Sequence, residues 1–223
     1  MSQTCKLRQF LRMAALGGAV SSACVSAAWA APEIGHAITV EKTVTGLVAG
    51  KKAALVQDDA VFKDEVIETA KESLARLKFL DETLLFVGPS STVKLDTFVY
   101  NPDNTASKLV ISASKGAFRF ISGNSDHAAY EIRTPYGSLG VSGTTLGFVI
   151  AGGRMIAVLK QGAMVVCPHA RLSANLARCI AVTKPDMAVI VSKSGAVGPV
   201  PKSADMRDFG DLCGDLCKRL FPQ

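Results

Sequence analysis

Hydrophobic and polar residues alternate with a period of two through the middle of the chain. Turn-forming clusters rich in Gly, Pro, Asn and Ser separate the alternating runs. The apolar positions of these runs are Val93, Leu95, Phe98, Tyr100, Phe118, Phe120, Tyr130 and Ile132. Short alternating runs at close spacing are typical of strands. The pattern predicts an all-β domain from about residue 50 to residue 191, built as a solenoid-like or sandwich-like stack of short strands.

One stretch, from Lys63 to Leu80, is compatible with two structures. Its apolar residues recur at helical spacing, but the same residues also fit two strands joined by a turn at 71–73. A partial repeat favours the strands. Residues 67–74 match residues 132–139 at four of eight positions, and the second copy contains Pro135 and Gly137. Because a helix interior excludes proline and disfavours glycine, we predict two related β-turn-β units.

The last residues have a different pattern. Residues 198–201 are predicted to be a linker, and Ser203 is a suitable N-cap for a helix. One face of that helix is apolar and consists of Met206, Phe209, Leu212, Cys213, Leu216 and Leu220. We therefore expect a signal peptide over 1–30, a lead-in strand over 31–49, the β domain over 50–197, and a linker with a short C-terminal helix over 198–223.

The N-terminal segment has the layout of a secretory signal. Lys6, Arg8 and Arg12 precede an apolar stretch rich in small residues, and Ala28 and Ala30 suit the peptidase at positions −3 and −1. We predict cleavage after Ala30 and a periplasmic or secreted protein. An uncleaved anchor fits less well, because the stretch lacks about 20 strongly apolar residues. Lipoprotein processing before Cys24 also fits less well, since no bulky aliphatic residue stands three positions upstream.

Removal of the signal changes the charge balance. The three basic residues of the signal account for half of the +6 net charge, which leaves about +3 on the rest of the chain. Basic and acidic residues are interleaved there, without a run of Lys or Arg. This distribution is typical of a solvated surface and argues against nucleic acid as a partner.

Four cysteines follow the signal: Cys167, Cys179, Cys213 and Cys217. Disulfides are the usual state of cysteines in an exported protein. The segments around Cys167 and Cys179 fit antiparallel neighbours, so we predict that these two pair. We predict that Cys213 and Cys217 form the second pair, with Gly214 breaking the helix between them so that they can close. A zinc site that uses His169 with Cys167 and Cys179 is the alternative.

Two Ser-x-x-Lys sequences occur, at Ser91 to Lys94 and at Ser112 to Lys115. Acyl-transfer enzymes use this spacing on a helix, where both side chains face one cleft. Both sequences fall in predicted strands, where residues three apart point to opposite faces. We therefore predict a protein that is not an enzyme and needs no cofactor or metal, and a serine acyl-transfer enzyme is the third choice.

Three stretches of the chain resemble the FecR-type domain, the periplasmic part of the iron-dicitrate regulator family. They are Asp64–Asp81, Leu84–Asp96 and the most specific one, Lys115–Gly123 followed by Ile132–Pro135 and Gly140–Thr144. The resemblance covers about residues 50–166. Two positions depart from the family pattern. Glu82 stands where the family turn Asp-Gly-Thr has glycine, and Ser142 stands where Gly-Val-Arg-Gly-Thr has arginine.

The resemblance implies an all-β, solenoid-like domain outside the cytoplasm. Regulators of this family also have a cytoplasmic anti-sigma segment and a transmembrane helix. We expect neither here, and therefore an exported stand-alone domain that acts as a binding or sensory module for an envelope protein or small ligand. A structural component of the cell envelope is the alternative. The candidate binding surface consists of Arg133, Thr134, Pro135, Gly140, Ser142, Gly143 and Thr144, although tight turns also account for its glycines.

Overall fold

The structure, a computed structural model, describes residues 31–169 and 179–201. In these residues the alternating segments form strands, as predicted, and the only helical element is the single turn η1 (His127–Ala129). The predicted helix after residue 201 and the signal peptide lie outside the described residues. The strands before residue 105 are β1 (Glu33–Glu41), β2 (Val44–Val48), β3 (Lys51–Ala54), β4 (Ala60–Phe62), β5 (Val66–Thr69), β6 (Leu74–Phe79), β7 (Leu84–Val87) and β8 (Thr92–Tyr100). The later strands are β9 (Ala106–Ile121), β10 (Tyr130–Thr134), β11 (Gly137–Ala151), β12 (Arg154–Pro168), β13 (Ile180–Val182), β14 (Met187–Ser192) and β15 (Gly195–Pro201).

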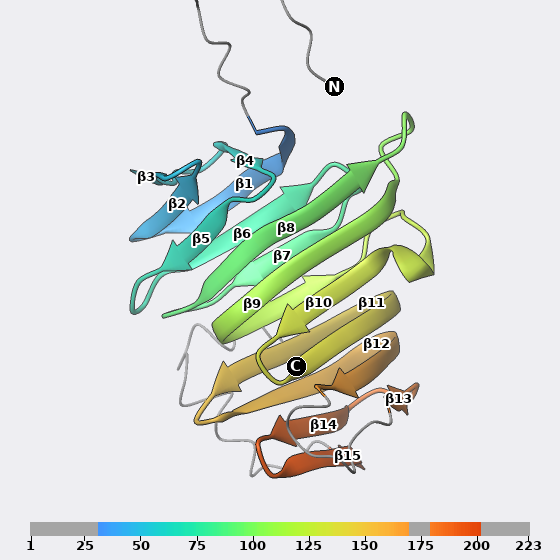
Figure 1. The fold of residues 1–223 in the computed structure, drawn as a ribbon. Coiled ribbons are helices and arrows are strands. Elements are labelled where there is room, and N and C mark those ends of the chain that lie inside the picture. The colour runs from blue at the N-terminus through green and yellow to red at the C-terminus, as the bar shows by residue number, and fades with distance from the viewer. Residues whose placement is uncertain (1–30, 170–178, 202–223) are drawn as a thin grey trace, which may run out of the picture. The chain divides into compact units, whose positions relative to one another are not determined.

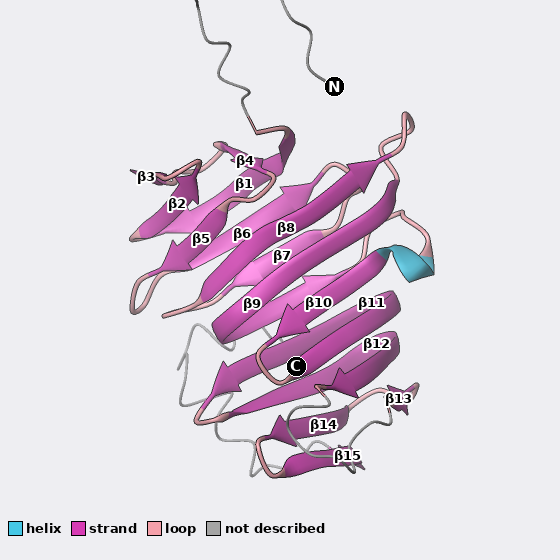
Figure 2. Ribbon diagram, viewed as in Figure 1, coloured by secondary structure: helices cyan, strands magenta, loops and turns pink. Residues whose placement is uncertain are grey.

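The described strands form one hydrogen-bonded sheet that folds over into two packed layers (Figures 1 and 2). Layer A has the order β3-β2-β5-β8-β9-β10-β11-β12-β13, and layer B has the order β4-β1-β6-β7-β9-β11-β12-β14-β15. The long strands β9, β11 and β12 belong to both layers. One half of each of these strands pairs within layer A, and the other half pairs within layer B. Of the two predicted architectures, the sandwich-like one describes this arrangement.

Glycines make the bends at which the long strands change layer. Gly116 in β9 has a φ of 111°, and a side chain there would collide with Ser91. Gly162 in β12 has a φ of 82°, and a side chain there would collide with the carbonyl group of Gly143. Positive φ and close backbone approach are both conditions that only glycine meets at low cost. The polypeptide therefore needs glycine at these bends to build two layers from one sheet.

The core lies between the layers and is continuous. Phe79 of β6 contacts Phe98 of β8 with ring centroids 4.9 Å apart, which joins layer B to layer A. Tyr130 of β10 meets Phe120 of β9 edge-on at 5.7 Å. Fully buried residues of both layers, including Ile67, complete one cluster. The alternation seen in the sequence thus places every second side chain in this core.

The stretch from Lys63 to Leu80 forms two strands, β5 and β6, and the strand prediction is confirmed. Its partial repeat has a different topology. The first copy leads from β5 in layer A to β6 in layer B, whereas the second copy, β10 and β11, is a hairpin within layer A. Similar sequences therefore form strands in both places, but the two units are not related as stacked coils.

Both ends of the described chain take part in the sheet. The predicted lead-in over 31–49 contributes β1 and β2, which pair with β6 and β5. Residues 198–201, predicted to be a linker, form the second half of β15 and pair with β14. Pro199 and Pro201 fit there because β15 is an edge strand, and an edge strand can lack N–H donors on its outer side.

Candidate functional site

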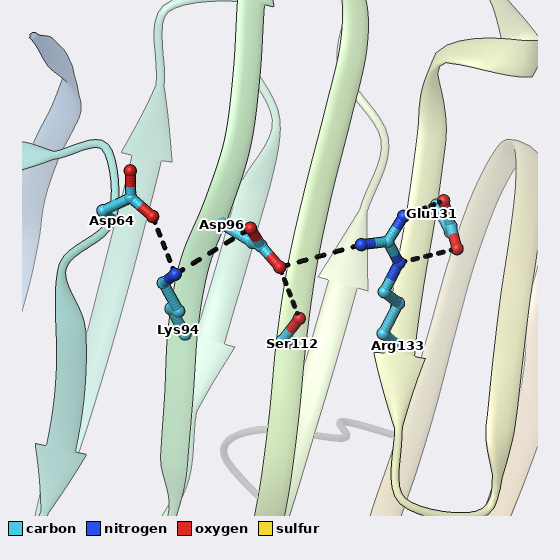
Figure 3. A network of polar contacts seen from close by, with 6 residues as sticks. All are labelled: Asp64, Lys94, Asp96, Ser112, Glu131 and Arg133. Carbon is cyan, nitrogen blue, oxygen red and sulfur yellow. Dashed lines mark hydrogen bonds and ion pairs between the residues drawn. The ribbon is translucent and has the colours of Figure 1, made fainter.

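A network of charged side chains lies on the outer surface of layer A (Figure 3). We call it the charged face, and it consists of Asp64, Lys94, Asp96, Ser112, Glu131 and Arg133. Lys94 and Asp96 lie on β8, Ser112 on β9, and Glu131 and Arg133 on β10, while Asp64 precedes β5. Because side chains alternate along a strand, the neighbours Leu95, Ile111 and Ile132 point inward and are fully buried.

Strand register brings these residues together from distant parts of the sequence. Lys94 pairs with Ser112 across β8 and β9, and Ser112 pairs with Arg133 across β9 and β10. The same row continues through Ser138 on β11 to Cys167 on β12. One row of outward positions therefore crosses five strands.

Asp96 stands at the centre of the charged face. Its carboxylate accepts a hydrogen bond from the Ser112 hydroxyl at 3.0 Å and lies 4.0 Å from the Lys94 ammonium. On the other side it lies 3.8 Å from the guanidinium of Arg133. Arg133 donates two hydrogen bonds to the Glu131 carboxylate, at 2.9 and 3.1 Å, and Lys94 pairs with Asp64 at 2.7 Å. Positive and negative groups therefore alternate across the strands.

These contacts keep the charges fixed without adding much stability. The hydrogen bond to Glu131 raises the pKa of Arg133, and the hydrogen bond to Asp64 raises the pKa of Lys94. Both side chains stay charged at any physiological pH. The Lys94 side chain is 41% exposed and that of Asp64 is 58% exposed, and exposed ion pairs contribute only about 0–1 kcal/mol each. The network therefore defines the chemistry of a surface rather than holding the fold together.

The structure divides the predicted binding surface into two groups. Arg133, Gly140 and Ser142 face outward on β10 and β11, and a Cβ added at Gly140 would meet open space. Pro135 is exposed in the turn between β10 and β11, and Gly143 is exposed at the bend of β11. Thr134 and Thr144 are buried, with 6% and 2% of their surfaces exposed. The two threonines are therefore not available to a partner in this structure.

Both buried threonines hold the backbone of a turn. The Thr134 hydroxyl donates to the carbonyl of Gly137 at 2.8 Å and accepts from the N–H groups of Tyr136 and Gly137. The Thr144 hydroxyl donates to the carbonyl of Ala163 at 2.6 Å and accepts from the N–H of Ser142. The backbone of Ser142 therefore helps to close the bend, a role that does not depend on the side chain at that position.

The two Ser-x-x-Lys sequences are not arranged as acyl-transfer sites. The Ser91 hydroxyl is buried, donates to the carbonyl of Pro89 and accepts from the N–H of Ala117. The hydroxyl of Ser112 donates to Asp96. In each case the hydroxyl proton is directed to an acceptor that belongs to the fold or to the charged face, and Lys94 is paired with Asp64.

Cys167 and Cys179 form a disulfide, with their Cα atoms 4.1 Å apart, as predicted. Both sulfurs are used in this bond, so the alternative zinc site with His169 does not form. The Nε2 atom of His169 lies 2.9 Å from the carbonyl oxygen of Thr134 instead. Within residues 31–169 and 179–201, no group of three or more His, Cys, Asp or Glu residues could hold a metal ion. Cys213 and Cys217 lie outside the described residues.

The structure has a second polar site, the carboxylate of Asp81, which the sequence did not identify as a site. The turn between β6 and β7 buries this carboxylate, which is only 2% exposed, and three hydroxyl groups donate to it. They belong to Thr83 at 2.9 Å, Ser125 at 2.7 Å and Tyr130 at 2.9 Å. Burial raises the pKa of Tyr130, so its hydroxyl stays a donor. The available signal was the turn Asp81-Glu82-Thr83, whose pattern in the sequence showed only a departure from the family turn Asp-Gly-Thr.

Each of these hydroxyls also accepts a hydrogen bond from a backbone N–H. The hydroxyl of Thr83 accepts from Gly123, that of Ser125 from Ala106, and that of Tyr130 from Ser125. Asp81 thus orients the hydroxyls that tie the 122–126 loop to β9, to β10 and to the turn between β6 and β7. An open hollow of about 410 Å³ lies at this edge of the sheet, and Asn101, Thr105, Asn124 and Asp126 are among its lining residues.

A comparison with known protein families gives a match to the central part of the chain. Residues 65–164 match the family model described as FecR protein. The FecR-type resemblance is confirmed for this stretch. The matched stretch contains five of the six residues of the charged face, together with Asp81. A comparison with curated proteins found no match.

Two solved structures of a candidate anti-sigma factor from Parabacteroides distasonis ATCC 8503 are similar to this chain. The one at 2.50 Å resolution shares 12% identity over 65% of this chain and 63% of its own, with a TM-score of 0.49. The one at 1.65 Å resolution shares 13% identity over 58% and 55%, with a TM-score of 0.44. The chain therefore covers less than two thirds of the length of either structure. Among the residues that the structure describes, no helix is long and apolar enough to span a membrane.

Proposed function

We propose that this protein is an exported FecR-type module that binds a partner protein through the charged face. The observation that carries the proposal is the row of alternating charges that crosses β8, β9 and β10 on the outside of layer A. Regulatory proteins of this family supply the precedent for a sensory role. The match to the family covers nearly all of the charged face.

The chemistry of the charged face favours a protein over a small ligand. Its groups spread over the open surface of neighbouring strands and do not converge on an enclosed cavity, whereas small-molecule sites are usually concave and largely apolar. Fixed charges of alternating sign give specificity and orient an approaching surface of complementary charge. Exposed Gly140 and Val165 beside this row leave room for close approach.

Export is part of the proposal. The signal-like N-terminus supports it, and so does the disulfide between Cys167 and Cys179, because such bonds persist in oxidising compartments. Mass spectrometry of the native protein should find Ala31 as the first residue. A native protein that retains Met1 would contradict export by the predicted route.

A capture experiment tests the binding role. The full mature chain, immobilised at one site, is incubated with envelope extract, and the bound proteins are quantified over a range of extract concentrations. We expect one stoichiometric, saturable partner. Arg133→Glu should weaken its binding at least about tenfold, because reversal of one interfacial charge leaves its partner groups unpaired.

The matched control is Lys42→Glu, which reverses an exposed cation that is paired with Glu72 away from the charged face. It should bind as the wild type does. Saturable binding that Arg133→Glu and Lys42→Glu leave equally strong would contradict the assignment to the charged face. Bulk association with wall material that does not saturate would instead support the alternative, a structural component of the envelope.

The enzyme alternative has its own test. A labelled β-lactam should leave Ser91 and Ser112 unmodified, because their hydroxyls are directed to Pro89 and Asp96. Covalent label on either serine would restore the serine acyl-transfer hypothesis.

A further inference from the structure

Two loops form the walls of the open hollow beside the Asp81 network, which we call the polar hollow. One wall is the hairpin loop between β8 and β9, and the other is the 122–126 loop together with η1. Both loops lie at the same end of the strands (Figure 1). The volume of the polar hollow is about 410 Å³, and sites for small molecules typically have about 300–1,000 Å³. The polar hollow is therefore large enough for a small molecule, and no residue of the charged face lines it.

Hydrogen bonds to buried groups hold the backbone of both walls. The N–H of Ala106 donates to the hydroxyl of Ser125 at 2.5 Å, which joins one wall to the other. The N–H of Asn124 donates to the carbonyl of Asp81 at 2.8 Å, and the N–H of Ser125 donates to the hydroxyl of Tyr130 at 3.0 Å. A ligand would meet loops that are already ordered, so its binding would not have to offset the entropy of ordering them.

The hairpin wall presents an amide in a fixed position. The Nδ2 atom of Asn101 donates to the Thr105 hydroxyl at 2.9 Å, and this hydroxyl donates to the Asp103 carboxylate at 2.6 Å. The backbone N–H of Asn101 also donates to the carbonyl of Thr105 at 2.7 Å. Among the described residues, the side-chain oxygen and the second amide hydrogen of Asn101 have no partner. The amide therefore keeps one acceptor and one donor for a ligand.

The opposite wall presents two side chains that the described fold does not use. Asn124 and Asp126 are exposed, and their side chains make no hydrogen bond or ion pair with the described residues. Asp126 is the residue that precedes η1, and an aspartate at such a position often caps the helix through its carboxylate. Here the carboxylate makes no capping hydrogen bond. Both side chains are thus available on a backbone that the Asp81 network holds in place.

The chemistry of these groups matches a ligand rich in hydroxyls. A hydroxyl both donates and accepts, and the two amides and the carboxylate offer it acceptors and donors at three points. Among the described residues no Lys or Arg lines the polar hollow, so it lacks the cations that recognise phosphate or carboxylate. The small apolar side chains of Ala106, Ala128 and Ala129 complete the lining and leave room for the carbon atoms of a ring.

We propose that the polar hollow binds one neutral sugar unit, either a free sugar or a unit within a glycan. Asn101, Asn124 and Asp126 bind its hydroxyls, and the three alanines contact its ring carbons. Because the polar hollow is open on one side, further units of a glycan can extend into solvent. The proposal is independent of the binding role of the charged face.

Nuclear magnetic resonance on the isotope-labelled full mature chain tests the proposal. The chain is titrated with glucose, with N-acetylglucosamine and with chitotetraose, the linear tetramer of N-acetylglucosamine. At least one of them should shift the backbone amide signals of residues 101–107 and 124–129 in a saturable way. We expect a dissociation constant of about 1 mM, since a small ligand with few contacts binds weakly. Tighter binding of the tetramer than of its monomer would identify a glycan unit as the ligand, and equal affinity would identify a free sugar.

Substitutions that spare the fold assign the binding to the polar hollow. Asn124→Ala and Asp126→Ala should each weaken sugar binding about tenfold, through the loss of one hydrogen-bonding group, and leave the melting temperature unchanged. Asp126→Asn should stay within about threefold of the wild type, because an amide oxygen also accepts from a hydroxyl. Gln161→Ala is the matched control, since it removes an exposed amide on β12 that does not line the polar hollow. It should bind as the wild type does.

Three results would overturn the proposal. They are the absence of a saturable shift with every sugar, shifts that Asn124→Ala and Asp126→Ala leave as strong as in the wild type, and tighter binding of spermidine or inorganic phosphate than of any sugar. Spermidine binding that Asp126→Asn abolishes would show that the polar hollow recognises a cation instead. Asn124→Ala should leave capture of the partner protein by the charged face unchanged, so the two proposals fail separately.

Discussion

The buried carboxylate of Asp81 should be among the most sensitive positions of the fold. It accepts four hydrogen bonds, from the N–H of Thr83 and from the hydroxyls of Thr83, Ser125 and Tyr130. Asp81→Ala leaves these donors without their acceptor in a place that water does not reach. A hydrogen bond to a charged group contributes about 1.5–3 kcal/mol, but the losses are not additive within one network.

We expect Asp81→Ala to lower the free energy of unfolding by about 3–4 kcal/mol. This value lies below the simple total of four bonds, because the variant also regains the cost of burying a charge. Asp81→Asn keeps the size of the side chain and one acceptor oxygen, so its loss should be about half as large. Domains of this size are stable by about 5–15 kcal/mol, and the variants should therefore still fold.

Urea denaturation followed by circular dichroism measures the effect, provided that the slope of free energy against urea is unchanged. Asp64→Asn is the matched control, since the Asp64 carboxylate is exposed and paired with Lys94, and its loss should stay within about 0.5 kcal/mol. Tyr130→Phe should cost about 1 kcal/mol in the wild type and clearly less in Asp81→Ala. A loss below about 1 kcal/mol for Asp81→Ala would refute the view that this carboxylate organises the 122–126 loop.

Two further predictions concern local stability. Glu82 has a φ of 69°, in the left-handed region, so Glu82→Gly should stabilise the fold by roughly 0.5–1 kcal/mol in the same urea assay, and a destabilised variant would contradict this. Cys167→Ser together with Cys179→Ser opens a bond with a sequence separation of 12 and should cost about 3 kcal/mol in the chain-entropy model. Peptide mapping without reduction should recover Cys167 linked to Cys179 in the wild type, and recovery of Cys167 linked to Cys213 or Cys217 would disprove the pairing.

The strands could be predicted from the sequence, and so could the side chains that point inward or outward, because both depend on local alternation. Lys94 between Val93 and Leu95 is an example, since the period of two alone places it on the outside. The partner of each strand could not be predicted in this way. Lys94 and Arg133 reach the same Asp96 carboxylate only through the register of β8, β9 and β10, which depends on contacts between residues far apart in the sequence. The charged face was therefore only partly visible, as Arg133 alone among its members belonged to the predicted binding surface.

The turn residues show a related limit. Gly143 was expected in a tight turn, and the structure places it at the bend of β11 with a φ of 57°. Thr134 and Thr144 were assigned to the predicted binding surface because they belong to the same glycine-rich stretch. Their hydroxyls instead satisfy backbone groups of the turns, as short polar side chains commonly do. A sequence pattern does not distinguish a hydroxyl that faces a partner from one that closes its own turn.

The two layers give this small domain two outer surfaces of opposite chemistry. Layer A presents fixed charges, which cost little to keep in water and are suited to reversible recognition. Layer B presents Val149, Ile156 and Val158, which are costly to leave in water and are buried in this structure. Because β9, β11 and β12 run through both layers, the strands that carry Ser112 and Gly140 on layer A also carry Val149, Ile156 and Val158 or their neighbours on layer B.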